Sequence, residues 1–334
     1  MSELRRHRGW GARVRLPAAA VAVLALLVTG CGGGGGSGEK KQLTIALQPG
    51  LAYAPLLVMK NEGTLEKALP NYKVSWKVLS SGSAIRDGMI SDDIQVGAPG
   101  LSPFLVGWNE GVDWKILSAL SNMDLWLMAK EKRLRSLKDF QGSDKIAMPA
   151  PDSMQSIVLR KGAQQQLGDA KALDKNIVAL DHPSALQALM SGQVAGHLTS
   201  PPYQFIEKQK GAHVMLRSSD LLGEHNFNLL VVREGFHNDN SEAMKTLFEQ
   251  TQKAMDTIKN DPDRAAKILA AESDDKPAAK QWKSFLQEEG VRFTTTPKGL
   301  MKFAQFMKKV GFVEEPPGSW RDLVFDNLKG LQGS

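Results

Sequence analysis

A regular alternation of strand-like and helix-like segments between residues 42 and 120 constrains the fold of this chain most strongly. Short segments rich in Val, Ile and Leu indicate strands, and longer segments with apolar residues three or four positions apart indicate helices. Strands that alternate with helices are typical of a parallel sheet covered by helices, so we expect an α/β fold. The strand patterns lie at 42–47, 72–79, 94–97 and 114–120, and the helix patterns at 54–69, 83–90 and 103–110.

The alternation continues as a second block and then gives way to helix patterns alone. Strand patterns follow at 124–129, 145–148, 177–180, 196–198, 213–216 and 228–232, with helix patterns at 153–167, 185–191 and 203–210. Helix patterns then occupy 240–260, 261–271, 276–288 and 297–310.

Two lobes are expected, because a chain of 334 residues exceeds the ~250–300 residues that one core usually holds. The first lobe is predicted to comprise residues 42–125 plus the tail 233–334, and the second lobe residues 126–232. The strands 124–129 and 226–232 would link the lobes as hinges. Ligands of such proteins lie between the lobes.

The N-terminus has the features of an export signal. Arginines between Arg5 and Arg15 precede the apolar run Leu16–Val28, which is too short to span a bilayer comfortably. Residues 1–30 are therefore predicted to be a signal peptide. Leu27-Val28-Thr29-Gly30-Cys31 resembles a bacterial lipobox, which implies a lipid on Cys31, although a stray cysteine after an ordinary signal peptide is the alternative.

Residues 31–41 then form a glycine-rich tether. Together these features predict an exported protein that is lipid-anchored to the bacterial cell membrane and faces the periplasm or the extracellular side.

Charge and motifs exclude several other classes. Five arginines and only one acidic residue lie within residues 1–30, so most of the net charge of +6 belongs to the leader, and nucleic-acid binding is not expected. The single cysteine excludes an intramolecular disulfide and cysteine catalysis in the folded part. The chain has no nucleophile elbow, P-loop or His-Glu-x-x-His motif, and its six histidines are scattered. We therefore expect a binding protein with no enzyme activity, cofactor or metal.

Four motifs resemble the solute-binding proteins of ABC importers for taurine, alkanesulfonates and nitrate. They lie at 45–63, at 81–84 with 94–100, at 137–147 and at 185–196. In the last motif Ala195-Gly196-His197 replaces the acidic residue that the family usually carries after the valine.

The resemblance implies a type II periplasmic-binding-protein fold. Each lobe would be a mixed, mostly parallel sheet flanked by helices, and the helical tail would lie on the first lobe. The protein would be a monomer that delivers a small polar solute to an ABC permease and its ATPase. Binding of a neutral heterocycle by the same fold, or a sensory or catalytic relative, are the alternatives.

Helix starts are the candidate ligand contacts, because their free N–H groups and partial positive charge suit oxyanions. The candidates are Ser81, Gly82 and Ser83 at one start, Ser102 at the next, and Asp152, Ser153 and Met154 at a third. Such serines could instead be ordinary helix caps.

Family analogy adds residues from the strand-end loops. Gln48 and Tyr53 would line the same cleft, and Ser200 and Pro201 would form the opposing wall. Trp126 is the candidate cleft aromatic because it lies on a predicted linker strand. An ionised Asp152 would favour a zwitterion such as taurine over a purely anionic ligand. Arg86 could supply a counter-charge, but we expect it to be a solvated surface arginine.

Overall fold

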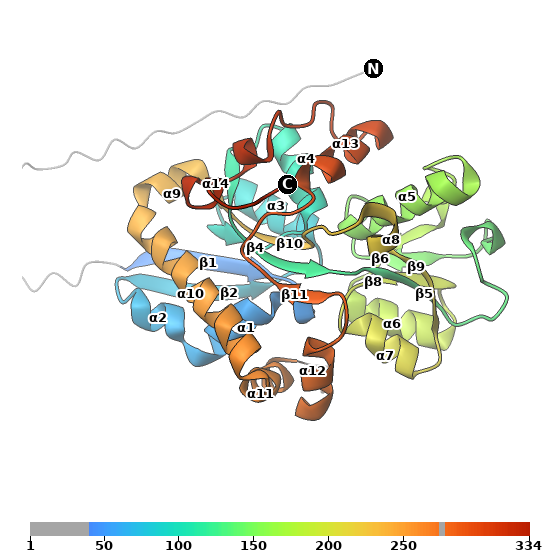
Figure 1. Ribbon diagram of the computed structural model, residues 1–334, viewed down its shortest axis with the longest axis horizontal. Coiled ribbons are helices and arrows are strands. Elements are labelled where there is room, and N and C mark those ends of the chain that lie inside the picture. Colours follow the sequence, from blue (N-terminus) through green and yellow to red (C-terminus); the bar gives the residue numbers. More distant parts are fainter. Residues whose placement is uncertain (1–39, 274–277) are drawn as a thin grey trace, which may run out of the picture. The chain divides into compact units, whose positions relative to one another are not determined.

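The computed structural model describes residues 40–273 and 278–334 (Figure 1). The predicted signal peptide, Cys31 and most of the predicted tether lie outside the described residues. Lys40–Ser334 form one compact unit that contains a six-stranded and a five-stranded sheet.

The first sheet has the strand order β11-β4-β10-β3-β1-β2. Strands β1, β2 and β3 pair in parallel, as the alternation predicted. β10 lies between β3 and β4 and runs antiparallel to both, so β4 points in the same direction as β3. The bounds are β1 (Lys41–Leu47), β2 (Tyr72–Val78), β3 (Val96–Gly97), β4 (Trp114–Met123), β10 (Asn228–Arg233) and β11 (Val291–Phe293).

The second sheet has the strand order β7-β6-β8-β5-β9. β6 pairs in parallel with β7 and β8, whereas β5 runs antiparallel to β8 and β9. Each sheet is therefore mixed, with most strands pointing one way. The bounds are β5 (Trp126–Ala129), β6 (Ile146–Met148), β7 (Ile177–Ala179), β8 (Gly196–Thr199) and β9 (His213–Arg217).

The helices between the strands follow the predicted order with two differences, because the helix expected at 54–69 is divided and the short helix α8, between β9 and β10, was not predicted. The single helix expected at 54–69 is two helices, because Gly63 adopts a left-handed conformation with φ of 60° and ends the first one. The bounds are α1 (Ala54–Glu62), α2 (Thr64–Ala68), α3 (Gly82–Ile90), α4 (Leu101–Asn109), α5 (Met154–Leu167), α6 (His182–Ser191), α7 (Tyr203–Gln209) and α8 (Ser218–Leu222).

The C-terminal tail contains six described helices and one strand. The tail was predicted to be helical, but its strand β11 pairs with the first sheet. α12 contacts the helices of the second sheet through Phe285, whose ring centroid lies 5.6 Å from that of Phe205 in α7. α13 contacts both α4 and α5. The bounds are α9 (Glu234–Asp239), α10 (Ser241–Asn260), α11 (Pro262–Glu272), α12 (Ala279–Leu286), α13 (Leu300–Val310) and α14 (Asp326–Lys329).

Two crossovers connect the sheets (Figure 1). β4 leads into β5 through Asp124 and Leu125, and β9 returns to β10 through residues 218–227. The strand predicted as the second hinge, 226–232, lies largely in β10 and therefore belongs to the first sheet. The second crossover is thus earlier in the chain than expected.

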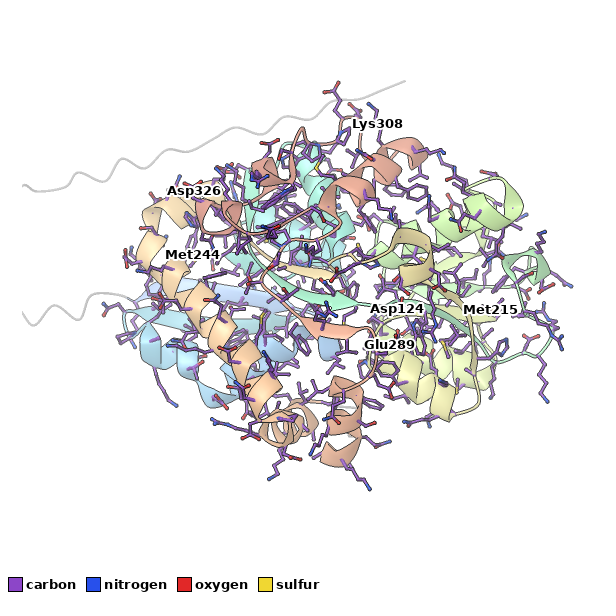
Figure 2. All side chains as sticks on the ribbon, in the orientation of Figure 1. Asp124, Met215, Met244, Glu289, Lys308 and Asp326 are labelled. Carbon is purple, nitrogen blue, oxygen red and sulfur yellow. The ribbon has the colours of Figure 1, made fainter. Side chains whose placement is uncertain are left out.

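The crossovers are hydrogen-bonded to each other. The Asp124 carboxylate accepts hydrogen bonds from the Ser219 N–H at 2.9 Å and from the Ser218 hydroxyl at 3.2 Å. The Leu125 and Ser218 backbones are joined at 2.8 Å. Figure 2 labels Asp124 where the elements of the two sheets meet. Within the described residues, none of the helices has the length and apolar character needed to span a bilayer.

Candidate ligand-binding site

A small cavity of about 20 Å³ lies where loops from the two sheets meet. This volume holds about one water molecule. Six of the predicted site residues line it: Gln48, Tyr53, Gly82, Ser153, Met154 and Ser200. Residues not predicted as contacts complete the lining: Pro49, Gly100, Pro103, Pro149, Gln155, His182 and Phe227. No arginine, lysine, aspartate or glutamate is among the lining residues.

Two helix starts bring free backbone donors to this cavity. At α3 the Ser81 hydroxyl accepts from Ala84 N–H at 3.1 Å, so Ser81 is a cap, and the Gly82 and Ser83 N–H groups have no acceptor among the described residues. At α5 Ser153 caps Ser156 N–H in the same way, which leaves the Met154 and Gln155 N–H groups without an acceptor in that part of the chain. Both ends can therefore donate to an oxyanion.

The third predicted helix start is that of α4, and its first N–H groups already have partners. Leu101 N–H donates to Phe227 O at 3.0 Å, and Ser102 N–H faces the Met154 sulfur at 3.3 Å. The Ser102 hydroxyl is buried and donates to the Asp152 carbonyl at 2.7 Å. Because a thioether is a weak acceptor, a ligand oxygen could replace Met154 at this N–H group.

Asp152 joins the two sheets' elements instead of presenting a free charge to the cavity. Its carboxylate accepts from the Ser83 hydroxyl and forms an ion pair with Arg86 at 3.0 Å. The Arg86 side chain is only 14% exposed, so the expectation of a solvated surface arginine was wrong. These contacts connect α3, which belongs with the first sheet, to the loop before α5, which belongs with the second sheet.

A backbone hydrogen bond joins loops of the two sheets on another side of the cavity. Leu51 N–H donates to the Pro201 carbonyl at 3.0 Å, so Pro201 serves this contact and does not line the cavity. The neighbouring Ser200 is buried and lines the cavity, and its hydroxyl has no partner within residues 40–273 and 278–334.

Tyr53 is held in the cavity wall by two amides. Its hydroxyl oxygen accepts hydrogen bonds from Gln48 Nε2 and Asn228 Nδ2, both at 2.5 Å. Burial raises the pKa of the Tyr53 phenol, so the hydroxyl keeps its proton.

A chain of buried polar groups that the sequence did not reveal leads away from the cavity. Gln155 Nε2 lies 3.1 Å from His182 Nε2, and His182 Nδ1 lies 2.9 Å from His197 Nε2. His197 Nδ1 lies 2.5 Å from the Glu207 carboxyl group. His182 and His197 are 15 residues apart and looked scattered in the sequence, but α6 and β8 place them together. Only the sheet topology could reveal this contact.

Burial shifts the pKa values of these groups toward their uncharged forms. Burial lowers the pKa of His182 well below its usual value and that of His197 to about 3, and it raises the pKa of Glu207 well above its usual value. Burial therefore opposes a charged His197–Glu207 ion pair, and the close contact is described as a hydrogen bond.

Trp126 lies apart from the cavity lining. Its indole N–H donates to Asp124 at 2.6 Å, and its ring packs edge-on against Phe205 and under Arg217. It therefore supports the crossover and the second sheet instead of forming a cavity wall. Among the described residues, no group of three or more His, Cys, Asp or Glu side chains is arranged to hold a metal ion.

Comparison with solved structures defines the class of fold. The chain superposes on the periplasmic aliphatic sulphonate binding protein SsuA from Escherichia coli with a TM-score of 0.66, at 18% identity, covering 86% of this chain and 98% of that one. For the alkanesulfonate-binding protein SsuA from Xanthomonas axonopodis pv. citri bound to MOPS the TM-score is 0.70, at 18% identity, with 86% and 99% covered. The fold is that of periplasmic binding proteins, as the sequence motifs implied.

The chain belongs to the NMT1-like family, whose model matches residues 36–272. It is 28% identical over 236 residues to a putative aliphatic sulfonates-binding protein of Bacillus subtilis, covering 69% of each chain. It is 23% identical over 288 residues to the taurine-binding periplasmic protein of Escherichia coli, covering 81% of this chain and 87% of the relative. These relatives are named as binding proteins, in agreement with the resemblance found in the sequence.

Proposed function

We propose that this protein is the solute-binding component of an ABC import system and that its solute is a small sulfonate. The observation that carries the proposal is the pair of helix starts, α3 and α5, whose free N–H groups meet at a polar cavity between the two sheets. Relatives named for aliphatic sulfonates and taurine support the same ligand class.

Recognition would rest on hydrogen bonds, because no charged side chain lines the cavity. Each helix end contributes ~0.3–1 kcal/mol to anion binding, and up to ~2 kcal/mol where partly buried. Two ends together with the hydroxyls of Tyr53 and Ser200 suit the three oxygens of a sulfonate. The three sulfonate oxygens can accept hydrogen bonds from the elements of both sheets at the same time. Such bonds would stabilise the arrangement in which the two sheets are closed around the ligand.

A sulfonate does not fit into about 20 Å³, so it must enter a more open arrangement of the two sheets, which then closes around it. We propose that each sheet with its helices acts as one lobe and that the crossovers at 124–125 and 218–227 act as the hinge. Residues 228–232 would move with the first lobe, in contrast to the boundary expected from the sequence.

The proposal also covers the location of the protein and its partners. The protein would act outside the cytoplasm as a monomer without enzyme activity, would be anchored through a lipid on Cys31, and would deliver its solute to a permease with an attached ATPase. Mass spectrometry of membrane-extracted protein should find an acylated N-terminal Cys31. An unmodified chain that begins at another residue would contradict the anchor.

Calorimetric titration tests the ligand class. Taurine and ethanesulfonate are titrated beside nitrate and a neutral aminopyrimidine. At least one sulfonate should bind at micromolar concentration, which corresponds to about −8 kcal/mol. Ser200→Ala should weaken that binding without lowering the melting temperature, whereas Ser184→Ala, at an exposed position of α6, should leave it unchanged. Binding of the aminopyrimidine alone would contradict the proposal and favour a neutral heterocycle.

A further inference from the structure

The buried chain Gln155–His182–His197–Glu207 has one direction. The amide nitrogen of Gln155 faces His182 Nε2, and an amide nitrogen can only donate a hydrogen bond. His182 Nε2 must therefore be the bare, accepting nitrogen of its ring. Because Nε2 accepts, it bears no proton, so the proton of the ring is on Nδ1, and this N–H donates to His197 Nε2.

The position of the proton on the His197 ring follows in the same way. His197 accepts at Nε2, so its proton is on Nδ1 and is donated to Glu207 Oε1. Every contact then has one donor and one acceptor. The chain therefore begins at an amide donor in the cavity wall and ends at a carboxyl oxygen in the interior.

This direction determines what Gln155 presents to the cavity. Its nitrogen is used by His182, and its oxygen has no hydrogen-bond partner among the described residues. Gln155 lines the cavity, so the oxygen is available as an acceptor for an occupant. Without His182 the amide could turn by half a rotation and offer its N–H₂ group instead.

The surroundings hold the chain rigidly. His197 and Glu207 are fully buried, and the ring of His182 stacks on that of Tyr203 with centroids 5.4 Å apart. The second oxygen of Glu207 is buried without a partner. Burying these polar groups costs stability that apolar side chains would not cost, so their arrangement calls for a purpose beyond packing.

We propose that Gln155 is a specificity-determining residue whose carbonyl oxygen accepts a hydrogen bond from an amino group of the ligand. His182, His197 and Glu207 are positioning residues that keep this oxygen turned toward the cavity. The inference rests on the proposed function and narrows it: the ligand class is an amino-substituted sulfonate, with its sulfonate at the helix starts and its amino group at Gln155.

The test compares taurine with ethanesulfonate, which has the same carbon skeleton without the amino group. Calorimetry on the wild-type protein should show taurine binding at least about tenfold more tightly, as expected for a hydrogen bond to a charged group. In Gln155→Leu the ratio of the two dissociation constants should fall to about one, while ethanesulfonate affinity changes by less than about threefold.

Two substitutions of Glu207 separate positioning from folding. Glu207→Gln keeps an acceptor for His197 and should keep the taurine preference. Glu207→Leu removes the acceptor and should lower the preference at least about threefold. His213→Gln alters a histidine whose ring Nε2 bonds to the Leu134 carbonyl, outside the chain from Gln155 to Glu207, and should leave the taurine preference unchanged. Melting curves confirm that each variant is folded, and if Glu207→Leu does not fold, Gln155→Leu and Glu207→Gln still decide.

Equal affinities of wild-type protein for the two sulfonates would overturn the inference and leave the proposed function standing. A taurine preference that survives Gln155→Leu would overturn it as well. If neither sulfonate binds, the proposed function itself fails, and the role of Gln155 fails with it.

Discussion

Gly82 shows how a missing side chain shapes the site. A Cβ atom at this position would lie 2.7 Å from Pro103 Cγ and 3.4 Å from the Gly100 nitrogen. The proline ring is rigid, so the start of α3 would have to move away from that of α4. Glycine therefore allows the two helix starts to converge on one cavity.

We predict that Gly82→Ala weakens sulfonate binding and lowers the free energy of unfolding by about 1–3 kcal/mol, as overpacking does. Gly235→Ala is the matched control, because a Cβ there meets no atom within 4 Å and residue 235 lies within α9. It should stabilise the protein slightly or have no effect. Calorimetry measures the sulfonate affinity of both variants, and urea denaturation measures their free energies of unfolding. Equal changes in Gly82→Ala and Gly235→Ala would contradict the predicted clash with Pro103.

The buried titratable groups make stability depend on pH. Burial lowers the pKa of His182, His197 and His225, so below pH ~6.5 the unfolded chain binds protons that the folded chain does not bind. Each such histidine lowers the free energy of unfolding by up to ~1.4 kcal/mol for every pH unit of acidification. Glu207, whose pKa is raised, acts in the opposite direction, because the folded chain holds a proton that the unfolded chain releases.

We predict that wild-type stability falls between pH 6.5 and 5 and that Glu207→Gln falls more steeply, because the opposing effect of Glu207 is gone. Urea denaturation at half-unit pH steps measures both slopes. A parallel pH dependence in the two proteins would show that Glu207 is ionised in the folded state.

At the scale of elements, the sequence predicted the order of strands and helices well, because periodic apolar patterns extend over whole elements. It missed elements whose signal is short or non-local. Gly63 was not distinguished from a glycine inside a helix, and the three-residue strand β11 has too few residues for a period. β10 was recognised as a strand, but its sheet depends on pairing with β4, which no local pattern encodes.

The candidate site was predictable to the same extent. Helix starts and strand ends are local features, so six of the lining residues were found. Gln155 and His182 were missed because their roles arise from contacts between α5, α6 and β8. The partner of Asp152 was also missed, because Arg86 lies 66 residues away in the sequence.

The contact of Asp152 with α3 leads to a prediction about elements. Both side chains of the Arg86–Asp152 pair are mostly buried, at 14% and 19% exposure, so replacing one leaves the other poorly solvated in the closed form. Asp152→Asn should weaken ligand binding about tenfold. Asp87→Asn is the control, because the Asp87 side chain is 68% exposed and such surface pairs contribute ~0–1 kcal/mol. Similar titration curves for the two variants would contradict the idea that this pair holds the lobes together.

At the scale of the whole molecule, two short crossovers that are hydrogen-bonded through Asp124 and Ser218 permit one dominant hinge motion. We predict that saturating taurine lowers the radius of gyration in small-angle scattering, whereas glycine at the same concentration leaves it unchanged. An unchanged radius with bound taurine would contradict closure of the two lobes about this hinge.

A crystal structure of the protein with taurine would locate the sulfonate. We predict that the sulfonate oxygens accept hydrogen bonds from the N–H groups at the starts of α3 and α5, close to Gly82 and Met154, with the two sheets closed around the ligand. A sulfonate bound elsewhere, for example in the more apolar pocket beside Leu57 and Trp282, would contradict it.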